Sequence, residues 1–149
     1  MIYLPTWEQL PDLDLYLDQV LYYINQETQA FLPPGEKALT ASMINNYVKH
    51  GHLKKPLKKK YQKEHLARLL VIALAKPVFS IQDICSMIDK ETEKQSNIDL
   101  YNQFVCAMQG QPLTNSLEII LLACQTIHHY RQTKEIIVQE REDSNENQS

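Results

Sequence analysis

The chain has 149 residues, of which 44% are hydrophobic and 22% charged, with a formal net charge of −3 and only three glycines. This is the composition of a soluble globular protein long enough to bury a core within one compact domain. Because sandwiches and barrels need glycine at many turns, the scarcity of glycine favours an all-α or mainly α fold.

Targeting and membrane segments are not predicted. The first residues have no basic stretch followed by an apolar one, which a signal peptide would need. The longest apolar runs, LLVIALA and IILLAC, are far shorter than the roughly 20 residues that span a bilayer. Cys85, Cys106 and Cys124 lie in apolar runs without a Cys-x-x-Cys pair, which indicates small buried side chains in a reducing compartment. We therefore expect a cytoplasmic protein with no membrane partner.

The first half of the chain contains two predicted helices. Apolar residues recur at helical spacing over 13–31, and the sequence PPGE ends that helix. Thr40 is a suitable N-cap and Gly51 a suitable stop for a second helix over 40–50. Its apolar face comprises Met43, Ile44, Tyr47 and Val48. The residues predicted to point away from the core are Ser42, Asn45, Asn46 and Lys49.

The second half begins with a charged segment over 52–61, which contains Pro56 and is predicted to form an extended hairpin or loop, the wing. A helix follows up to Pro77 and is apolar all round from Leu69 to Ala75, as a central buried helix would be. The later predicted helices are a short one capped by Ser80, one over 97–109, and a long one from about 115–118 to Val138. The tail, 141–149, is predicted to be disordered.

The charges are divided unevenly along the chain. Residues 1–36 hold six acidic residues and no basic ones, whereas residues 49–76 hold nine basic residues and one acidic residue. An acidic chain with one basic segment indicates a localised anionic partner.

Enzymatic and metal sites are not predicted. The sequence has no glycine-rich phosphate loop, no Gly-x-Ser-x-Gly elbow and no His-Glu-x-x-His motif. His50 and His52 lie among lysines that would repel a cation. His128 and His129 are adjacent, so on a helix their side chains diverge by about 100° and do not chelate one ion easily. We expect no catalysis, no cofactor and no metal.

Double-stranded DNA is the partner that the basic segment favours. Asparagine disfavours helix interiors, so two adjacent asparagines in a capped helix are unusual, and asparagine binds adenine in the major groove through two hydrogen bonds. Lysines would bind phosphate without reading sequence. The predicted DNA-binding residues are Thr40, Ser42, Asn45, Asn46, Lys49, Lys54, Lys55, Lys58, Lys59 and Lys60. The alternative is a non-enzymatic helical adaptor whose basic face docks an acidic protein. Arg68 is a weaker candidate for DNA binding, because its position also suits an ordinary surface residue of the central helix. Tyr47 and Tyr61 are predicted to be core residues.

The order of elements resembles the MerR-type winged helix-turn-helix transcription regulators. Matching positions include Thr40 at the cap, Gly51 after the helix, Pro56 and Tyr61 in the wing, and Phe79 in the sequence Phe-Ser-Ile. Asn45 and Asn46 stand where the family has backbone-contacting Arg and Tyr, and residues 13–31 would have to supply the first helix of the motif. The stretches LPTWEQLPDLDLYLDQV and LTASMINNYVKHGHLKKPLKKKY are more closely similar to a bacterial family of short proteins classed as a domain of unknown function with a MerR-like DNA-binding domain.

These resemblances imply a domain organisation and an assembly. Residues 1–95 would form the winged helix-turn-helix domain with its N-terminal helix, and residues 96–140 a helical hairpin. MerR-type proteins dimerise through C-terminal helices, so the resemblance implies a homodimer that reads two half-sites. Together with the predicted DNA-binding residues, the resemblance leads us to expect a transcription regulator.

Overall fold

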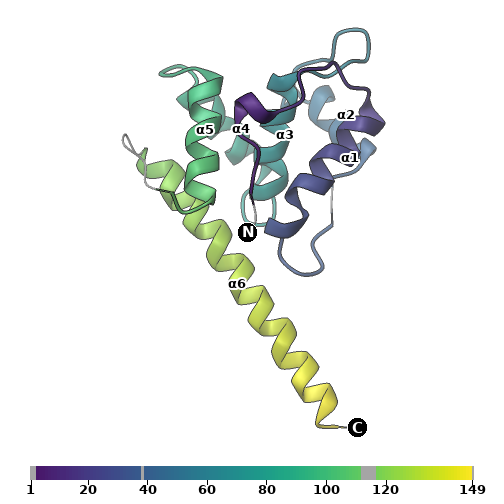
Figure 1. Cartoon of the computed structure of the whole chain (residues 1–149), viewed down its shortest axis with the longest axis vertical. Helices are drawn as coiled ribbons and strands as arrows, with labels where there is room; N and C mark the ends of the chain where they lie inside the picture. Colours follow the sequence, from purple (N-terminus) through teal and green to yellow (C-terminus); the bar gives the residue numbers. More distant parts are fainter. Residues whose placement is uncertain (1–2, 38, 112–116, 149) are drawn as a thin grey trace.

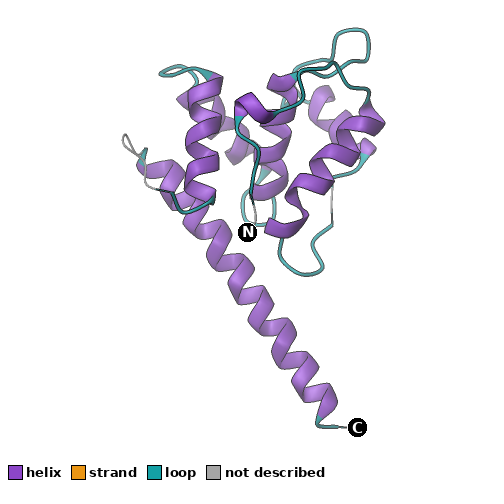
Figure 2. Ribbon diagram, viewed as in Figure 1, coloured by secondary structure: helices purple, strands orange, loops and turns teal. Residues whose placement is uncertain are grey.

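The computed structural model describes residues 3–37, 39–111 and 117–148, and its architecture is mainly helical (Figure 1). Figure 2 shows helices joined by loops, with no regular strand within the described residues. The prediction of a mainly α fold is therefore confirmed. The α-helices are α1 (Leu17–Thr28), α2 (Ala41–Lys49), α3 (Lys63–Ala75), α4 (Ile81–Glu91), α5 (Asn97–Met108) and α6 (Glu118–Glu146). Two 3₁₀ turns, η1 (Trp7–Gln9) and η2 (Gln29–Phe31), flank α1.

Helix α3 is the centre of the fold and packs against α1, α4, α5 and α6. Ten of its 13 residues are buried, including every residue from Leu69 to Ala75. Each large aliphatic side chain buried in this way contributes about 1.5–3 kcal/mol through the hydrophobic effect. The sequence prediction of a central helix that is apolar on all sides is confirmed.

The N-terminal segment, residues 4–15, lies across the body and contacts α5 (Figure 1). The backbone N–H of Leu4 donates to Oε1 of Gln109 at 2.8 Å. The backbone N–H of Trp7 donates to Oδ1 of Asn102 at 2.9 Å. Side-chain amides in α5 and directly after it therefore supply the acceptors that an extended segment cannot find in itself.

Helix α1 begins four residues later than predicted from the sequence, at Leu17 instead of Leu13. Leu15 is extended and pairs with Tyr61 at the end of the wing, through N–H···O distances of 2.9 and 2.8 Å in the two directions. Leu13, counted in the helical pattern, is 72% exposed. The helical spacing of apolar residues continues by chance into residues 13–16. There the backbone of Leu15 forms its hydrogen bonds with Tyr61 and not within a helix.

Helix α2 has the caps predicted from the sequence. The Thr40 side chain accepts a hydrogen bond from the Met43 N–H at 3.1 Å, and Gly51 adopts a φ of +77° just past the C-terminal end. Only glycine adopts that conformation without a steric penalty. The side chain of Asn25 in α1 bonds both backbone groups of Leu39, at 3.0 and 3.1 Å, and so fixes the approach to α2.

Helices α4 and α5 each begin at a serine cap. The Ser80 hydroxyl accepts from the Asp83 N–H and the Ser96 hydroxyl from the Asp99 N–H, both at 3.1 Å. The Ser80 cap was predicted, and α4 runs on to Glu91. Helices α5 and α6 then pack against each other, and both run downward in the view of Figure 1.

Helix α6 extends beyond the body and continues through Glu146. This differs from the predicted disorder of residues 141–149 over all but the last positions. Adding a residue to an existing helix requires no new nucleation, so a packed N-terminal half supports an exposed C-terminal half. A hydrogen bond of 3.1 Å from the Gln139 side chain to Asp143, one turn later, adds local support.

The cysteines lie in or near the core, and the helices of the described residues are not of the membrane-spanning kind. Cys85 and Cys124 are buried and Cys106 is partly buried, and all three are free thiols. Across 3–37, 39–111 and 117–148, none of the helices combines the length and the hydropathy that crossing a membrane would require.

Candidate nucleic-acid interface

The outer face of α2 is polar because its apolar residues turn towards α1 and the core. Ile44 is fully buried, while Met43, Tyr47 and Val48 are half-buried and pack on the core. The side chains left on the outer face are all exposed: Ser42, Asn45, Asn46 and Lys49. The orientation predicted for these four residues is confirmed.

The wing leaves α2 through contacts to a single carbonyl. The backbone N–H groups of His52 and Leu53 both donate to the Tyr47 carbonyl, at 2.8 and 3.1 Å. Leu53 is only 3% exposed and anchors this end of the wing in the core. The wing therefore starts at a fixed distance and direction from α2.

The tip of the wing is a tight turn that carries two lysines. Leu57 and Lys60 pair across it, with the Lys60 N–H donating to the Leu57 carbonyl at 2.9 Å. Between them Lys58 and Lys59 have φ values of +50° and +64°. Positive φ at both central residues is the pattern of a type I′ turn, which natural hairpins usually build with Asn-Gly. Both lysines are strained, since the left-handed conformation costs a residue other than glycine roughly 1–2 kcal/mol.

Two side chains of α3 hold the base of the wing. Arg68 donates from Nε to the His52 carbonyl at 2.6 Å and from Nη1 to Asp89 of α4 at 2.9 Å. His65, only 6% exposed, lies 3.1 Å from the Lys54 carbonyl through Nε2. Its Nδ1 accepts from the Gln62 N–H at 3.0 Å, so the ring is neutral with its proton on Nε2. Burial lowers the pKa of His65, and the hydrogen bond to Lys54 opposes that shift.

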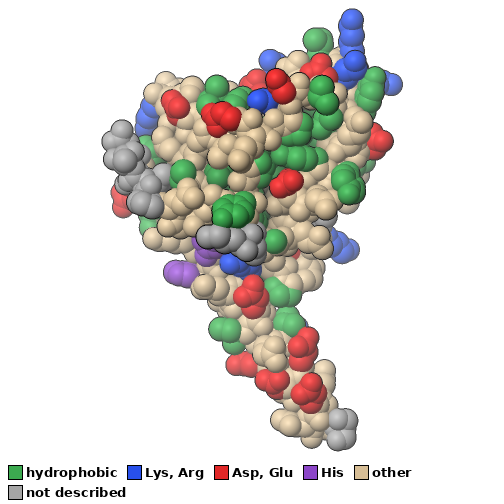
Figure 3. All heavy atoms as spheres, viewed as in Figure 1, with side chains coloured by type: hydrophobic (Ala, Val, Ile, Leu, Met, Phe, Trp, Pro, Cys, Tyr) green, Lys and Arg blue, Asp and Glu red, His purple; other side chains and the backbone are tan. Residues whose placement is uncertain are grey.

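The wing lysines carry charge that the surrounding protein does not neutralise. Lys54, Lys55, Lys58 and Lys59 are exposed, and none of the ion pairs in the described part of the chain includes them. Lys60 is half-buried, with Nζ 5.7 Å from the centre of the Tyr16 ring. Figure 3 shows Lys and Arg side chains gathered at the end of the molecule where the wing projects.

The ten residues predicted for DNA binding lie on two elements that meet at the Tyr47 carbonyl. Nine of them are exposed, and Lys60 is half-buried. Thr40 already uses its hydroxyl oxygen as the α2 cap. Arg68, the weaker candidate, is turned towards the wing base and Asp89, so it serves as a support. Tyr61 is buried and Tyr47 half-buried, as predicted for core residues.

Three further features of the wing were not predicted. His65 belongs to no motif in the sequence, although a histidine near the start of a helix that follows a loop is well placed to bond that loop. Leu57 is 71% exposed at the tip, and Tyr16 is 51% exposed beneath Lys60. The pairing that brings Tyr16 there joins residues 46 positions apart, so local sequence carried no signal for it.

Residues 5–104 match the family described as Domain of unknown function (DUF1836). The match covers about two thirds of the chain, from the N-terminal segment into α5, and the chain therefore belongs to this family. It includes α2, the wing and α3, whereas α6 lies beyond it. No curated protein and no solved structure matches the chain.

Proposed function

We propose that the chain is a DNA-binding transcription regulator that reads the major groove with α2 and grips phosphates with the wing. The observation that carries the proposal is the exposed polar face of α2 beside a wing whose lysines lack acidic partners within the described residues. The resemblance to MerR-type regulators supports the same assignment. The fixed link between α2 and the wing, through the Tyr47 carbonyl, would let both bind one duplex at once.

The division of labour between the two elements follows from their side chains. Asn45 and Asn46 can each donate and accept, which suits them to the N6 and N7 atoms of adenine. The lysines donate only and would bind phosphate oxygens, which gives affinity without sequence preference. The I′ turn would present Lys58 and Lys59 together at the farthest point of the wing.

The proposal extends to a homodimer formed through α6. Beyond Ile127, α6 has no further buried residue, yet Ile136 is 59% exposed and Ile137 and Val138 are partly so. Apolar residues on a helix that projects from the body would be covered by a second copy. A mass measured by light scattering would be twice that of the 17.4 kDa chain, and Ile136→Lys with Ile137→Lys would return it to the monomer value.

The DNA-binding proposal is tested by fluorescence anisotropy with a mixed-sequence duplex over a series of salt concentrations. Five wing lysines per protomer predict a slope of about −4 to −5 for log K against log salt, and about twice that for a dimer. Lys58→Glu with Lys59→Glu and Lys60→Glu should abolish binding. A control with the same change of charge, Lys90→Glu with Lys134→Glu and Arg141→Glu, should leave most of it.

Lack of binding at low salt, by protein with a native circular dichroism spectrum, would contradict the proposal. Equal losses in the wing variant and the control would show a response to net charge alone and would remove the wing from the interface.

Sequence reading by α2 is tested after selection of preferred sites from a random duplex library. Asn45→Ala with Asn46→Ala should reduce preference for the selected site over mixed DNA, by about 1–3 kcal/mol for each lost pair of hydrogen bonds. Binding to mixed DNA should be nearly unchanged. If affinity for all sequences falls by the same factor, the two asparagines do not read bases.

A further inference from the structure

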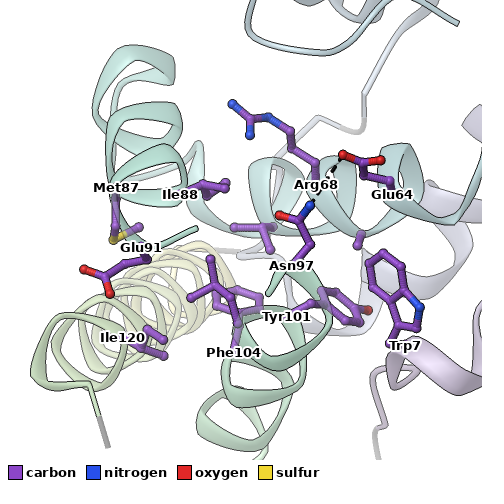
Figure 4. Close-up of a pocket in the computed structure, with 13 residues that line it drawn as sticks. Trp7, Glu64, Arg68, Met87, Ile88, Glu91, Asn97, Tyr101, Phe104 and Ile120 are labelled. Carbon is purple, nitrogen blue, oxygen red and sulfur yellow. Dashed lines mark hydrogen bonds between the residues drawn. The ribbon is translucent and has the colours of Figure 1, made fainter. Parts of the chain in front are cut away.

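An apolar hollow lies between α3, α4 and α5, away from α2 and the wing tip (Figure 4). It has a volume of about 80 Å³. Its apolar walls include Trp7, Val71, Leu100, Tyr101, Phe104 and Ile120. A second, more open hollow of about 500 Å³ lies between α4 and α6 and is walled by Ile119 and Leu122. Met87 and Glu91 line both hollows, so the two adjoin.

Glu91 is the unusual member of this wall. It is 8% exposed, and its Oε2 atom is buried without a hydrogen-bond partner. Its other oxygen lies 3.8 Å from Nζ of Lys94, whose side chain is 71% exposed. Figure 4 places Glu91 between Met87 and Ile120, at the end of the hollow opposite Trp7.

The position of this carboxylate is unfavourable in two ways. A buried charged oxygen without a partner has lost its hydration and gains no hydrogen bond in return. Glu91 is also the last residue of α4, where the helix dipole already presents partial negative charge. Both effects would be relieved by a cation at Oε2.

The other charged residues that line the inner hollow already have partners. Arg68 bonds His52 and Asp89, and Glu64 accepts from the Asn97 amide at 3.4 Å (Figure 4). In the outer hollow, Asp83 and Lys90 are exposed to solvent. Among the charged groups of these walls, Glu91 is therefore the one with a buried oxygen that no described residue bonds.

We propose that the two hollows form a binding site for a small organic amine, with its ammonium group at Oε2 of Glu91 and its hydrocarbon part in the apolar space. The inner hollow is smaller than the cavity of about 150 Å³ that holds a benzene ring, so it takes a short alkyl chain. Bulkier parts of the ligand would occupy the outer hollow. This site is separate from the proposed DNA interface and does not depend on it.

Three probes of one chain length test the proposal: hexylamine, hexanol and hexanoate. Trp7 is the one tryptophan of the chain and lines the inner hollow, so its fluorescence reports binding, and calorimetry gives an independent measurement. At pH 7 the protonated amine should bind at least about tenfold more tightly than the alcohol, because a charge-assisted hydrogen bond is roughly twice as strong as a neutral one. Hexanoate should bind most weakly.

Three variants locate the effect. Glu91→Gln keeps the shape but removes the charge, and should bind amine and alcohol equally. Glu93→Gln makes the same change at an exposed position two residues later and should keep the preference. Ala67→Leu, at a buried position in the wall, should fill the inner hollow and weaken amine and alcohol alike.

The response of the amine preference to the two glutamate variants decides the test. A preference for the amine that disappears in Glu91→Gln and persists in Glu93→Gln supports the site. Equal affinity for the three probes, no calorimetric signal with folded wild-type protein, or a preference that survives Glu91→Gln would overturn it. Because no DNA is present, none of these results depends on whether the wing binds DNA.

Discussion

The wing and α3 follow each other in the sequence, yet they are held in place by different forces. In α3, ten of 13 residues are buried, and the helix is fixed by the apolar area that it removes from water. In the wing, four lysines are exposed, and the segment is fixed mainly by hydrogen bonds to Tyr47, His65, Arg68 and Leu15, with Leu53 and Tyr61 as its buried anchors. The wing thus carries exposed positive charge, and the adjoining α3 provides buried apolar area. Changes to the exposed lysines of the wing should therefore alter binding with little effect on folding, and changes to the buried residues of α3 should do the reverse.

The largest expected effect tests this separation directly. Ile72 in α3 is fully buried, so Ile72→Ala should lower the free energy of unfolding by about 2–5 kcal/mol. Reversing the charge of Lys58, Lys59 and Lys60 should change it by no more than about 0.5–1 kcal/mol, as surface substitutions usually do. Urea denaturation of both variants checks the difference. Comparable losses would mean that the wing contributes to the core more than its exposure indicates.

A smaller effect concerns the turn at the wing tip. Lys58→Asn with Lys59→Gly supplies the residues that a type I′ turn prefers and should raise the free energy of unfolding by about 1 kcal/mol. The matched control is Lys54→Asn with Lys55→Gly, where neither lysine has a positive φ, and it should give no gain. Thermal denaturation at high salt, which screens the lost charges, compares the two. A gain in both variants would point to charge repulsion instead of turn strain.

The smallest expected effect is a dependence of stability on pH at the wing base. Since burial lowers the pKa of His65 in the folded protein, the unfolded chain takes up its proton first as pH falls. The contribution of His65 is therefore complete above its unfolded pKa of about 6.5 and declines below it. Denaturation at pH 7.5 and 5.5 measures the decline. His65→Gln should reduce it, whereas His129→Gln, at an exposed position, should not; the same decline in all three proteins would exclude His65 as its source.

The sequence predicted those parts of the fold that depend on neighbours in the chain. The Thr40 and Ser80 caps, the stop at Gly51 and the burial of α3 each follow from residues a few positions apart. The start of α1 was mispredicted because Leu15 is satisfied by Tyr61, a partner that periodicity cannot reveal. The C-terminal end of α6 was mispredicted because composition does not record that a helix already packed upstream can continue.

The part of the candidate interface that depends on neighbours in the chain could also be predicted. The exposed face of α2 follows from helical geometry once the apolar positions are known. The supports of the wing do not, since Arg68 meets His52 and Asp89 only in the folded chain. Glu91 carries no signal in the local sequence, and only the folded chain makes it a buried carboxylate.

The N-terminal segment has a consequence for the order in which the protein folds during synthesis. The acceptors for the N–H groups of Leu4 and Trp7 belong to Gln109 and Asn102, which the ribosome adds about a hundred residues later. Because chains emerge from the N-terminus at about 5–20 residues per second, this segment has no native partner in α5 for at least several seconds. Helices α1 to α3 can meet before α5 exists, and a segment that is made before all of them is among the last to reach its place.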